Sequence, residues 1–163
     1  MKITNVSNKL LTFLEEFESF ESKPYLCPAK VATIGYGTTF YFDTKKRVTM
    51  NDKPITIQEA RRLKKGHLDN IFCPLVDKLC RDNLTQNEFD AIVSFVYNAG
   101  ATYRTKSGQI RYYNLFKNVN DLMAHKDLEI YWSGLAVTGG GKKLNGLIRR
   151  RKREALIYTQ NKY

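Results

Sequence analysis

Residues 17–39 have the sequence FESFESKPYLCPAKVATIGYGTT, and the expected order of secondary structure can be built outward from it. Apolar residues at steps of three and four predict an amphipathic helix from Leu10 to Phe20, with Glu18 at the border between its apolar and polar faces. Pro24 ends helical geometry and leads into extended chain. β-Branched and aromatic residues punctuated by glycines then predict a small antiparallel sheet over residues 31–48.

Helical patterns fill most of the chain beyond this sheet. Two capping boxes, each a Thr followed three residues later by Glu, predict helix starts at Thr56 and Thr85. Pro74 is expected to end or kink the first of these helices, and Gly100 to cap the second. Further helical spacing covers residues 112–116, 122–132 and 147–158, with the loop Gly139-Gly140-Gly141 before the last. One helix, a small sheet and about five helices predict an α+β protein with segregated elements.

The chain is strongly basic. It has 163 residues, with 27 Lys and Arg against 16 Asp and Glu, which gives a formal net charge of +11. A length of this size suits one domain with its own core. The basic surplus is concentrated between Lys142 and Arg153 and predicts attraction to a polyanion, which charge alone leaves open as nucleic acid, an anionic membrane surface or an anionic wall polymer.

Localisation is expected to be cytoplasmic at synthesis. The N-terminal apolar run is too short for a secretory signal peptide, and no later stretch approaches the roughly 20 apolar residues of a membrane span. Three cysteines, an odd number, favour a reduced intracellular environment over a disulfide scaffold.

A spacing of chemically active residues lies inside the opening stretch. Glu18 is followed after eight residues by Cys27, and Cys27 after five residues by Thr33, which begins the motif TIGYGTT. This pattern resembles the phage-type lysozymes, the endolysins of glycoside hydrolase family 24. The resemblance continues through SFVYNAG at residues 94–100, Trp132, the Gly139–Lys142 loop and GLIRRRKRE at residues 146–154. Two departures are visible: the family usually has histidine at Thr38 and glycine at Ser19.

The resemblance implies a lysozyme-like fold and a muramidase. It suggests a single catalytic domain over residues 1–163, with a small N-terminal β-hairpin lobe at about 13–56, a larger C-terminal helical lobe at about 57–163, and substrate held between them. The implied activity is hydrolysis of the β-1,4 bond between N-acetylmuramic acid and N-acetylglucosamine in peptidoglycan. No cofactor and no metal are expected.

Three residues are predicted to be catalytic. Glycosidic cleavage needs a proton donor and, on the other face of the sugar, a nucleophile or a base that activates water. Glu18 is the candidate acid, because its border position allows the desolvation that keeps a carboxyl protonated. Cys27 occupies the second position, as nucleophile or general base, and a nearby cation is expected to favour its thiolate. Thr33 is similar to the family's threonine that holds the catalytic water.

Three further residues are predicted to bind substrate. Tyr36 has a ring that suits stacking on a sugar, and Asn98 an amide that suits hydrogen bonding to N-acetyl groups. The resemblance implies that one of Arg149, Arg150 and Arg151, here taken as Arg150, faces the substrate and pairs with Glu18, and the other two are expected on a solvated face. Cys73 and Cys80, by contrast, are predicted to be buried core residues.

Alternative functions remain open at this point. A basic polyanion-binding or nucleic-acid-binding module fits the charge, although no nucleic-acid motif is present. A catalytically silent lysozyme fold and a lytic transglycosylase are further alternatives. The favoured hypothesis has bacterial peptidoglycan as partner, no nucleic acid, no stable membrane insertion and a monomer. Release from the host cytoplasm to the cell wall or periplasm at lysis is expected to depend on a holin.

Overall fold

The computed structural model describes residues 2–139 and 141–163, so Gly140 of the predicted glycine loop lies outside the described residues. The chain forms two compact units. One is Asn5–Phe72, and the other combines Cys73–Tyr163 with the residues before Asn5. Residues 57–72, which the sequence suggested as part of the helical lobe, therefore belong to the unit that carries the first hairpin.

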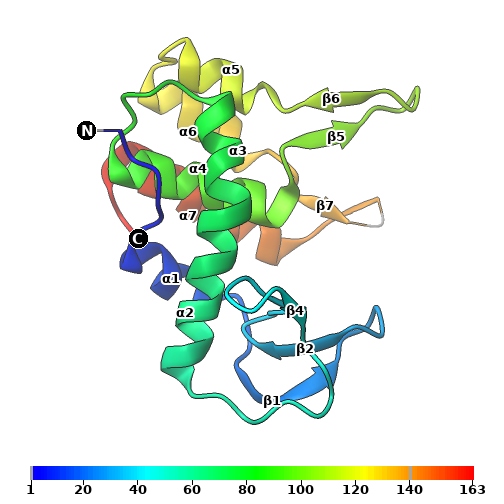
Figure 1. The fold of residues 1–163 in the computed structure, drawn as a ribbon. Coiled ribbons are helices and arrows are strands. Elements are labelled where there is room, and N and C mark those ends of the chain that lie inside the picture. The colour runs from blue at the N-terminus through cyan, green and yellow to red at the C-terminus, as the bar shows by residue number, and fades with distance from the viewer. Residues whose placement is uncertain (1, 140) are drawn as a thin grey trace. The chain divides into compact units, whose positions relative to one another are not determined.

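The unit Asn5–Phe72 contains three helical segments and four strands (Figure 1). In chain order these are α1 (Asn8–Glu15), β1 (Glu21–Leu26), β2 (Ala32–Gly35), β3 (Phe40–Tyr41), β4 (Lys46–Arg47), α2 (Ile57–His67) and the π-helix η1 (Leu68–Phe72). Strand β1 pairs antiparallel with β2, and β3 pairs antiparallel with β4. The predicted antiparallel sheet is thus present as two separate two-stranded ribbons.

Helix α1 is shorter than predicted. It begins after Ser7, whose hydroxyl accepts a hydrogen bond from the amide of Leu10, and it ends at Glu15 rather than at Phe20. The chain tightens beyond it, because the amide of Phe17 donates to Leu14 O at 3.0 Å, an i→i−3 bond. Glu18 consequently lies in the turn between α1 and β1 and not on a helix face.

Helix α2 packs directly on strand β2, which explains why it belongs to the hairpin unit. Thr56 caps its N-terminus as predicted, accepting from the amide of Glu59 at 3.1 Å. Its buried side chains are Ala60, Leu63 and Lys64, at the i, i+3 and i+4 positions of one helix face. Two of these three are apolar, and the third is a lysine whose charged group is buried within the same unit.

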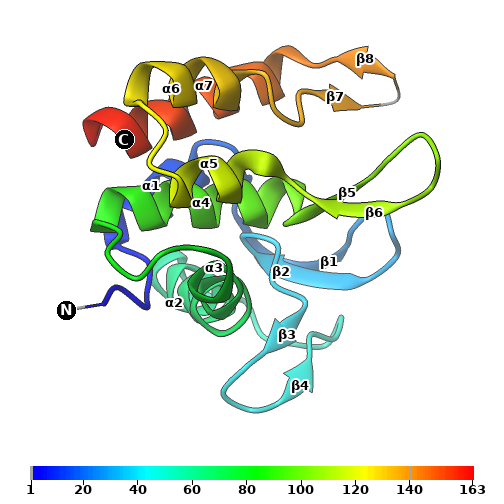
Figure 2. The same cartoon turned by 90° about the horizontal axis from the view of Figure 1, so that it is seen from above.

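The second unit is mainly helical and carries two hairpins that the sequence did not predict (Figures 1 and 2). Its elements are α3 (Cys73–Leu79), α4 (Gln86–Ala99), β5 (Thr102–Arg104), β6 (Ile110–Tyr112), α5 (Asn114–Asn120), α6 (His125–Ser133), β7 (Thr138–Gly139), β8 (Lys142–Lys143) and α7 (Asn145–Gln160). The hairpins are β5–β6 and β7–β8, both antiparallel. Pro74 lies at the second position of α3, directly after the π-helical turn, so the predicted helix changes type at that point.

Helices α4 and α7 pack against each other and form the centre of this unit, with α6 packed on α7. The capping box at the start of α4 is confirmed, since the amide of Thr85 donates to Glu88 Oε2 at 2.7 Å. Gly100 caps its C-terminus with φ of 79° and donates to Val96 O, also as predicted.

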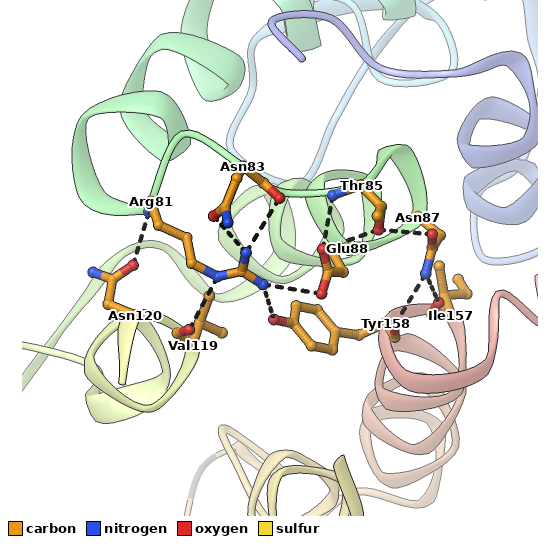
Figure 3. A network of polar contacts seen from close by, with 9 residues as sticks. All are labelled: Arg81, Asn83, Thr85, Asn87, Glu88, Val119, Asn120, Ile157 and Tyr158. Atoms are coloured by element: carbon orange, nitrogen blue, oxygen red, sulfur yellow. Dashed lines mark hydrogen bonds and ion pairs between the residues drawn. The ribbon is translucent and has the colours of Figure 1, made fainter. Parts of the chain in front are cut away.

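A polar network around Arg81 ties four segments of the helical unit together (Figure 3). The guanidinium of Arg81 donates to Glu88 Oε1 at 3.0 Å and to the carbonyl of Val119 at 3.3 Å. The Arg81 amide donates to Asn120 Oδ1 at 2.8 Å. Glu88 therefore accepts hydrogen bonds both within the α4 capping box and from Arg81. Because Arg81 also bonds residues of α5, this network fixes α4 relative to α5.

The contact between β2 and α2 makes Gly35 a testable position. Gly35 has φ of 64°, and a Cβ there would lie 2.9 Å from Ala60 Cβ. We expect Gly35→Ala to lower the free energy of unfolding by about 2–4 kcal/mol, because it combines a left-handed backbone with overpacking. Urea denaturation measures this value.

Gly37→Ala is the matched control. Gly37 has φ of 84°, but a Cβ there would meet nothing within 4 Å. Its cost should be limited to the backbone term, about 1–2 kcal/mol. Equal losses for the two variants would contradict the close packing of β2 on α2.

Candidate active site

Glu18 is held by a buried lysine from helix α2. Lys64 Nζ lies 2.5 Å from Glu18 Oε2 and donates to the backbone carbonyl of Tyr36 at 2.7 Å. The Glu18 side chain is 18% exposed and that of Lys64 is 6% exposed. The carboxyl group is therefore half-buried, as predicted, although the turn after α1 and not a helical stripe places it there.

Sequence reasoning did not identify Lys64. The available signal was its position, since Ala60, Leu63 and Lys64 follow the spacing of a buried helix face. Lysine is almost never fully buried unless it is paired. A charged residue at a core position of an otherwise regular amphipathic helix is a local conflict, and such conflicts are typical of functional positions.

Cys27 begins the loop that joins β1 to β2. The loop is closed by hydrogen bonds from the Cys27 amide to Val31 O at 3.1 Å and from the Lys30 amide to Cys27 O at 2.7 Å. Hydrogen bonds from the backbone amides of Val31 and Ala29 and from the Thr33 side chain lower the pKa of the Cys27 thiol, against a smaller opposing effect of desolvation. Backbone amides supply the stabilisation of the thiolate that the sequence suggested a cation would give.

Thr33 lies beside Cys27 in strand β2. Its side chain is buried, and its hydroxyl donates to Val31 O at 2.9 Å. The same hydroxyl hydrogen-bonds to Cys27, which contributes to the lowered pKa of the thiol. The structure thus brings together Cys27 and Thr33, two of the predicted catalytic residues, at one end of the first hairpin.

Tyr25 connects these groups electrostatically. Burial raises the pKa of Tyr25, and the negative charges of Glu21, Cys27 and Glu18 raise it further. The pKa of the Tyr25 phenol thus responds to the negative charges of both Glu18 and Cys27.

Tyr36 and Thr38 are buried in the turn that follows β2. The Tyr36 ring packs on Phe20 with 5.6 Å between centroids and is 8% exposed, so little of its surface is open to a sugar. Backbone hydrogen bonds of 2.9 Å in both directions join Ile34 to Thr38 and close the turn. Among the described residues the buried Thr38 hydroxyl has no hydrogen-bond partner.

The other predicted binding residues, Asn98 and Arg150, belong to the helical unit, where Arg150 pairs with the carboxylate of Glu154. This carboxylate is fully buried and accepts from Arg150 Nε at 3.0 Å, from Ser94 Oγ at 2.7 Å, and from Arg151. Arg151 also donates a hydrogen bond to the side-chain oxygen of Asn98, and Asn98 is an exposed residue.

The expectation that two of the three arginines lie on a solvated face is wrong. Arg150 and Arg151 are both buried, and only Arg149 of the three is exposed. They are buried because Glu154, one helical turn further along α7, neutralises them within the core. The pairing of one arginine with Glu18 stays a prediction.

The remaining cysteines behave as predicted. Cys73 and Cys80 are buried thiols, and burial raises the pKa of Cys80 to about 12. Cys27 is the more accessible thiol and has the lowered pKa. Within residues 2–139 and 141–163, no cluster of three His, Cys, Asp or Glu side chains forms a possible metal site.

The chain combines a short helix, a small antiparallel hairpin and a helical unit. A half-buried carboxyl lies before the hairpin, and the hairpin carries a thiol and a hydroxyl. This is the organisation of a lysozyme-type glycosidase. Comparison with known proteins agrees with this class. A family model described as phage lysozyme matches residues 15–154. The chain belongs to the phage lysozyme family.

Individual relatives support the same assignment. The chain is 30% identical over 154 residues to the endolysin of Acyrthosiphon pisum secondary endosymbiont phage 1, which covers 94% of this chain and 97% of that protein. It is 29% identical over 94% of its length to the endolysin of Bacillus phage B103, but spans 54% of that protein. The solved endolysin from Escherichia coli O157:H7 phage FAHEc1 superposes with a TM-score of 0.74 and 28% identity, covering 100% of this chain and 99% of that chain.

These findings confirm the predicted family and the α+β, lysozyme-like fold. They make the chain a glycosidase that degrades peptidoglycan, and they give no support to a nucleic-acid-binding module. In the described part of the chain, no helix is both long enough and apolar enough to cross a membrane.

The thiol of Cys27 can be tested directly by alkylation. Iodoacetamide should modify Cys27 with a pH midpoint below that of an ordinary cysteine, because amides and the Thr33 hydroxyl favour its thiolate. Thr33→Val should move that midpoint to higher pH. Mass spectrometry of the folded protein measures the modification at each cysteine, and Cys73 and Cys80 serve as internal controls that should remain unmodified. A Cys27 midpoint equal to that of a free cysteine would contradict the geometry of the loop.

Proposed function

We propose that this protein is a muramidase that hydrolyses the β-1,4 bond between N-acetylmuramic acid and N-acetylglucosamine, the reaction of EC 3.2.1.17. The observation that carries the proposal is that one compact unit contains both a half-buried Glu18 and a Cys27 whose thiol has a lowered pKa. Hydrolysis of a glycosidic bond needs an acid and a second group that acts on the anomeric carbon or on water, and these two residues supply them.

Glu18 acts as the general acid. Its carboxyl protonates the oxygen of the leaving sugar while the bond from that oxygen to the anomeric carbon breaks. The Lys64 ammonium lies beside this carboxyl and stabilises the negative charge that remains on it after the proton has left.

Cys27 acts on the other side of the bond in one of two ways. Its thiolate attacks the anomeric carbon, which gives a covalent sugar–cysteine intermediate and retention of configuration, or it removes a proton from a water molecule, which gives inversion and no adduct. Both routes draw on the lowered pKa of the thiol. Mass spectrometry of enzyme trapped during turnover distinguishes them.

Thr33 positions the reacting water or the thiolate. Its hydroxyl has one proton, which serves either Val31 O or Cys27, and its oxygen retains acceptor capacity for water. Substrate contacts are assigned to Tyr36, Asn98 and Arg150, with Tyr36 contributing through its backbone and edge because its ring packs on Phe20.

We also propose a biological setting on the basis of the family resemblance. The protein would act as a monomer that accumulates in the host cytoplasm and reaches peptidoglycan at the end of infection, with a holin opening the route.

Turbidity loss of purified cell walls tests the proposed roles. Wild type should clear the suspension, and Glu18→Gln should lose at least about 1,000-fold in rate because the amide has no proton to give at neutral pH. Cys27→Ser should retain little activity, since a serine hydroxyl is a far weaker nucleophile and base, and Cys27→Asp should recover part of it because a carboxylate can fill either role.

Cys80→Ser is the matched control for the cysteine variants. Cys80 is buried in the helical unit and is assigned no chemistry, so its variant should clear walls at a rate set by the fraction that is folded. Clearing by Glu18→Gln at the wild-type rate would reject the assigned acid.

A further inference from the structure

Lys64 is the only buried lysine among the described residues. Burying an ammonium group is costly unless charged or polar partners replace its water. Lys64 has two such partners, Glu18 Oε2 at 2.5 Å and the carbonyl oxygen of Tyr36 at 2.7 Å. A lysine held in this way connects the carboxyl group to a backbone oxygen of the turn after β2.

We propose that Lys64 is the positioning residue for Glu18. Its ammonium group, anchored on the Tyr36 carbonyl, fixes the Glu18 carboxyl and stabilises the negative charge that this carboxyl acquires when it gives up its proton. The proposal rests on the role of Glu18 as general acid. Nothing in the spacing of Glu18, Cys27 and Thr33 assigns a role to residue 64.

The acceptor that anchors Lys64 is rigid. Tyr36 lies between two glycines with positive φ, 64° at Gly35 and 84° at Gly37, in a turn closed by the Ile34–Thr38 hydrogen bonds. Gly35 is in turn packed against Ala60, one turn before Lys64 on α2. The ammonium group is therefore fixed from both its own helix and the turn.

Glu18 needs such an anchor because its own backbone gives it little support. It lies beyond the end of α1, and its amide makes a long 3.5 Å hydrogen bond to Glu15 O. A carboxyl group in a turn can adopt several rotamers, and displacement of a catalytic group by about 1 Å can reduce the rate about 100-fold. The ion pair with Lys64 selects one arrangement of the side chain.

The charge of Lys64 also matters during proton transfer. The O–H bond of Glu18 breaks as a new O–H bond forms on the leaving glycosidic oxygen, and the electron pair stays on the carboxylate. The Lys64 ammonium group interacts more strongly with the carboxylate than with the acid, so it stabilises the transition state relative to the protonated ground state.

Other charged groups surround this pair in the same unit. Glu15 and Arg61 form their own ion pair at 2.9 Å, which leaves little net charge at that side. Burial, followed by the positive charge of Lys64, lowers the pKa of His67, so the imidazole is mostly neutral at pH 7. Tyr25 and Tyr36 both have raised pKa values, chiefly from burial, and stay neutral.

Replacement of Lys64 by methionine, an apolar residue of similar length, tests the proposal. On soluble peptidoglycan fragments we expect Lys64→Met to lower kcat about 10- to 100-fold with KM within about twofold of wild type, because positioning and not binding is lost. The melting temperature should stay within about 4 °C of wild type, because an apolar side chain suits the site.

Lys65→Met is the matched control, because it removes one positive charge from the adjacent position of the same helix. Lys65 pairs with Asp69 at 2.6 Å and makes no contact assigned to catalysis. Its kcat and its KM should each stay within about twofold of wild type.

Lys64→Arg provides a second variant that keeps the charge. Its larger, planar guanidinium cannot contact both Glu18 and the Tyr36 carbonyl along the same directions, so kcat should fall about 3- to 10-fold with KM within about twofold of wild type. A Lys64→Arg enzyme with wild-type kcat overturns the positioning role, and this result decides the matter even where Lys64→Met fails to fold.

Other results also separate the possibilities. Wild-type kcat for Lys64→Met overturns the proposal, as does a loss of activity that is accounted for by the unfolded fraction of the variant or that appears in KM with kcat unchanged. If Glu18→Gln is inactive but Lys64→Met is fully active, the acid assignment stands and only the role of Lys64 fails. If Glu18→Gln is active, the proposed function itself fails.

Discussion

The close approach of strand β2 to helix α2 at Gly35 is the constraint on which the candidate site depends. Without a side chain at Gly35, the strand can lie against Ala60, and the next turn of α2 then places Lys64 beneath the Tyr36 carbonyl. Lys64 in turn reaches Glu18, which lies beyond the end of α1. A glycine, a helix face and a buried cation thus determine where the carboxyl group of Glu18 lies.

Each compact unit buries a carboxyl group against cations. In the hairpin unit Glu18 meets Lys64 and keeps some contact with solvent, whereas in the helical unit Glu154 is fully buried and meets Arg150 and Arg151. Buried ion pairs are weak evidence for stability, because desolvation offsets much of the attraction. The fully buried pair at Glu154 is suited to fixing α7 against α4, and the partly exposed pair at Glu18 is suited to chemistry.

Much of the fold could be predicted from the sequence, because local signals govern it. The caps at Thr56, Thr85 and Gly100 are where the side-chain chemistry placed them. The end of α1 could not be predicted, because apolar spacing continues to Phe20 while the backbone has already tightened after Glu15. The β5–β6 and β7–β8 hairpins also escaped prediction, since their strands have two or three residues and are exposed, and so show no alternation.

The candidate site was predictable in part for the same reason. Glu18, Cys27 and Thr33 follow a spacing within one stretch of chain, and Cys27 and Thr33 do meet. Lys64 lies 46 positions after Glu18 and reaches it only through tertiary packing, and the burial of Arg150 and Arg151 depends on Glu154 on the same helix and on α4. Local spacing contains no information about such long-range partners.

A muramidase hydrolyses the β-1,4 bond that joins N-acetylmuramic acid to the next N-acetylglucosamine and leaves N-acetylmuramic acid at the new reducing end. Mass spectrometry of the soluble fragments that the wild-type protein releases from purified peptidoglycan tests this activity most directly. Fragments that end in a reducing N-acetylmuramic acid, each heavier by one water than the corresponding anhydro product, are the result we expect. Fragments that end in 1,6-anhydro-N-acetylmuramic acid or in reducing N-acetylglucosamine would contradict it.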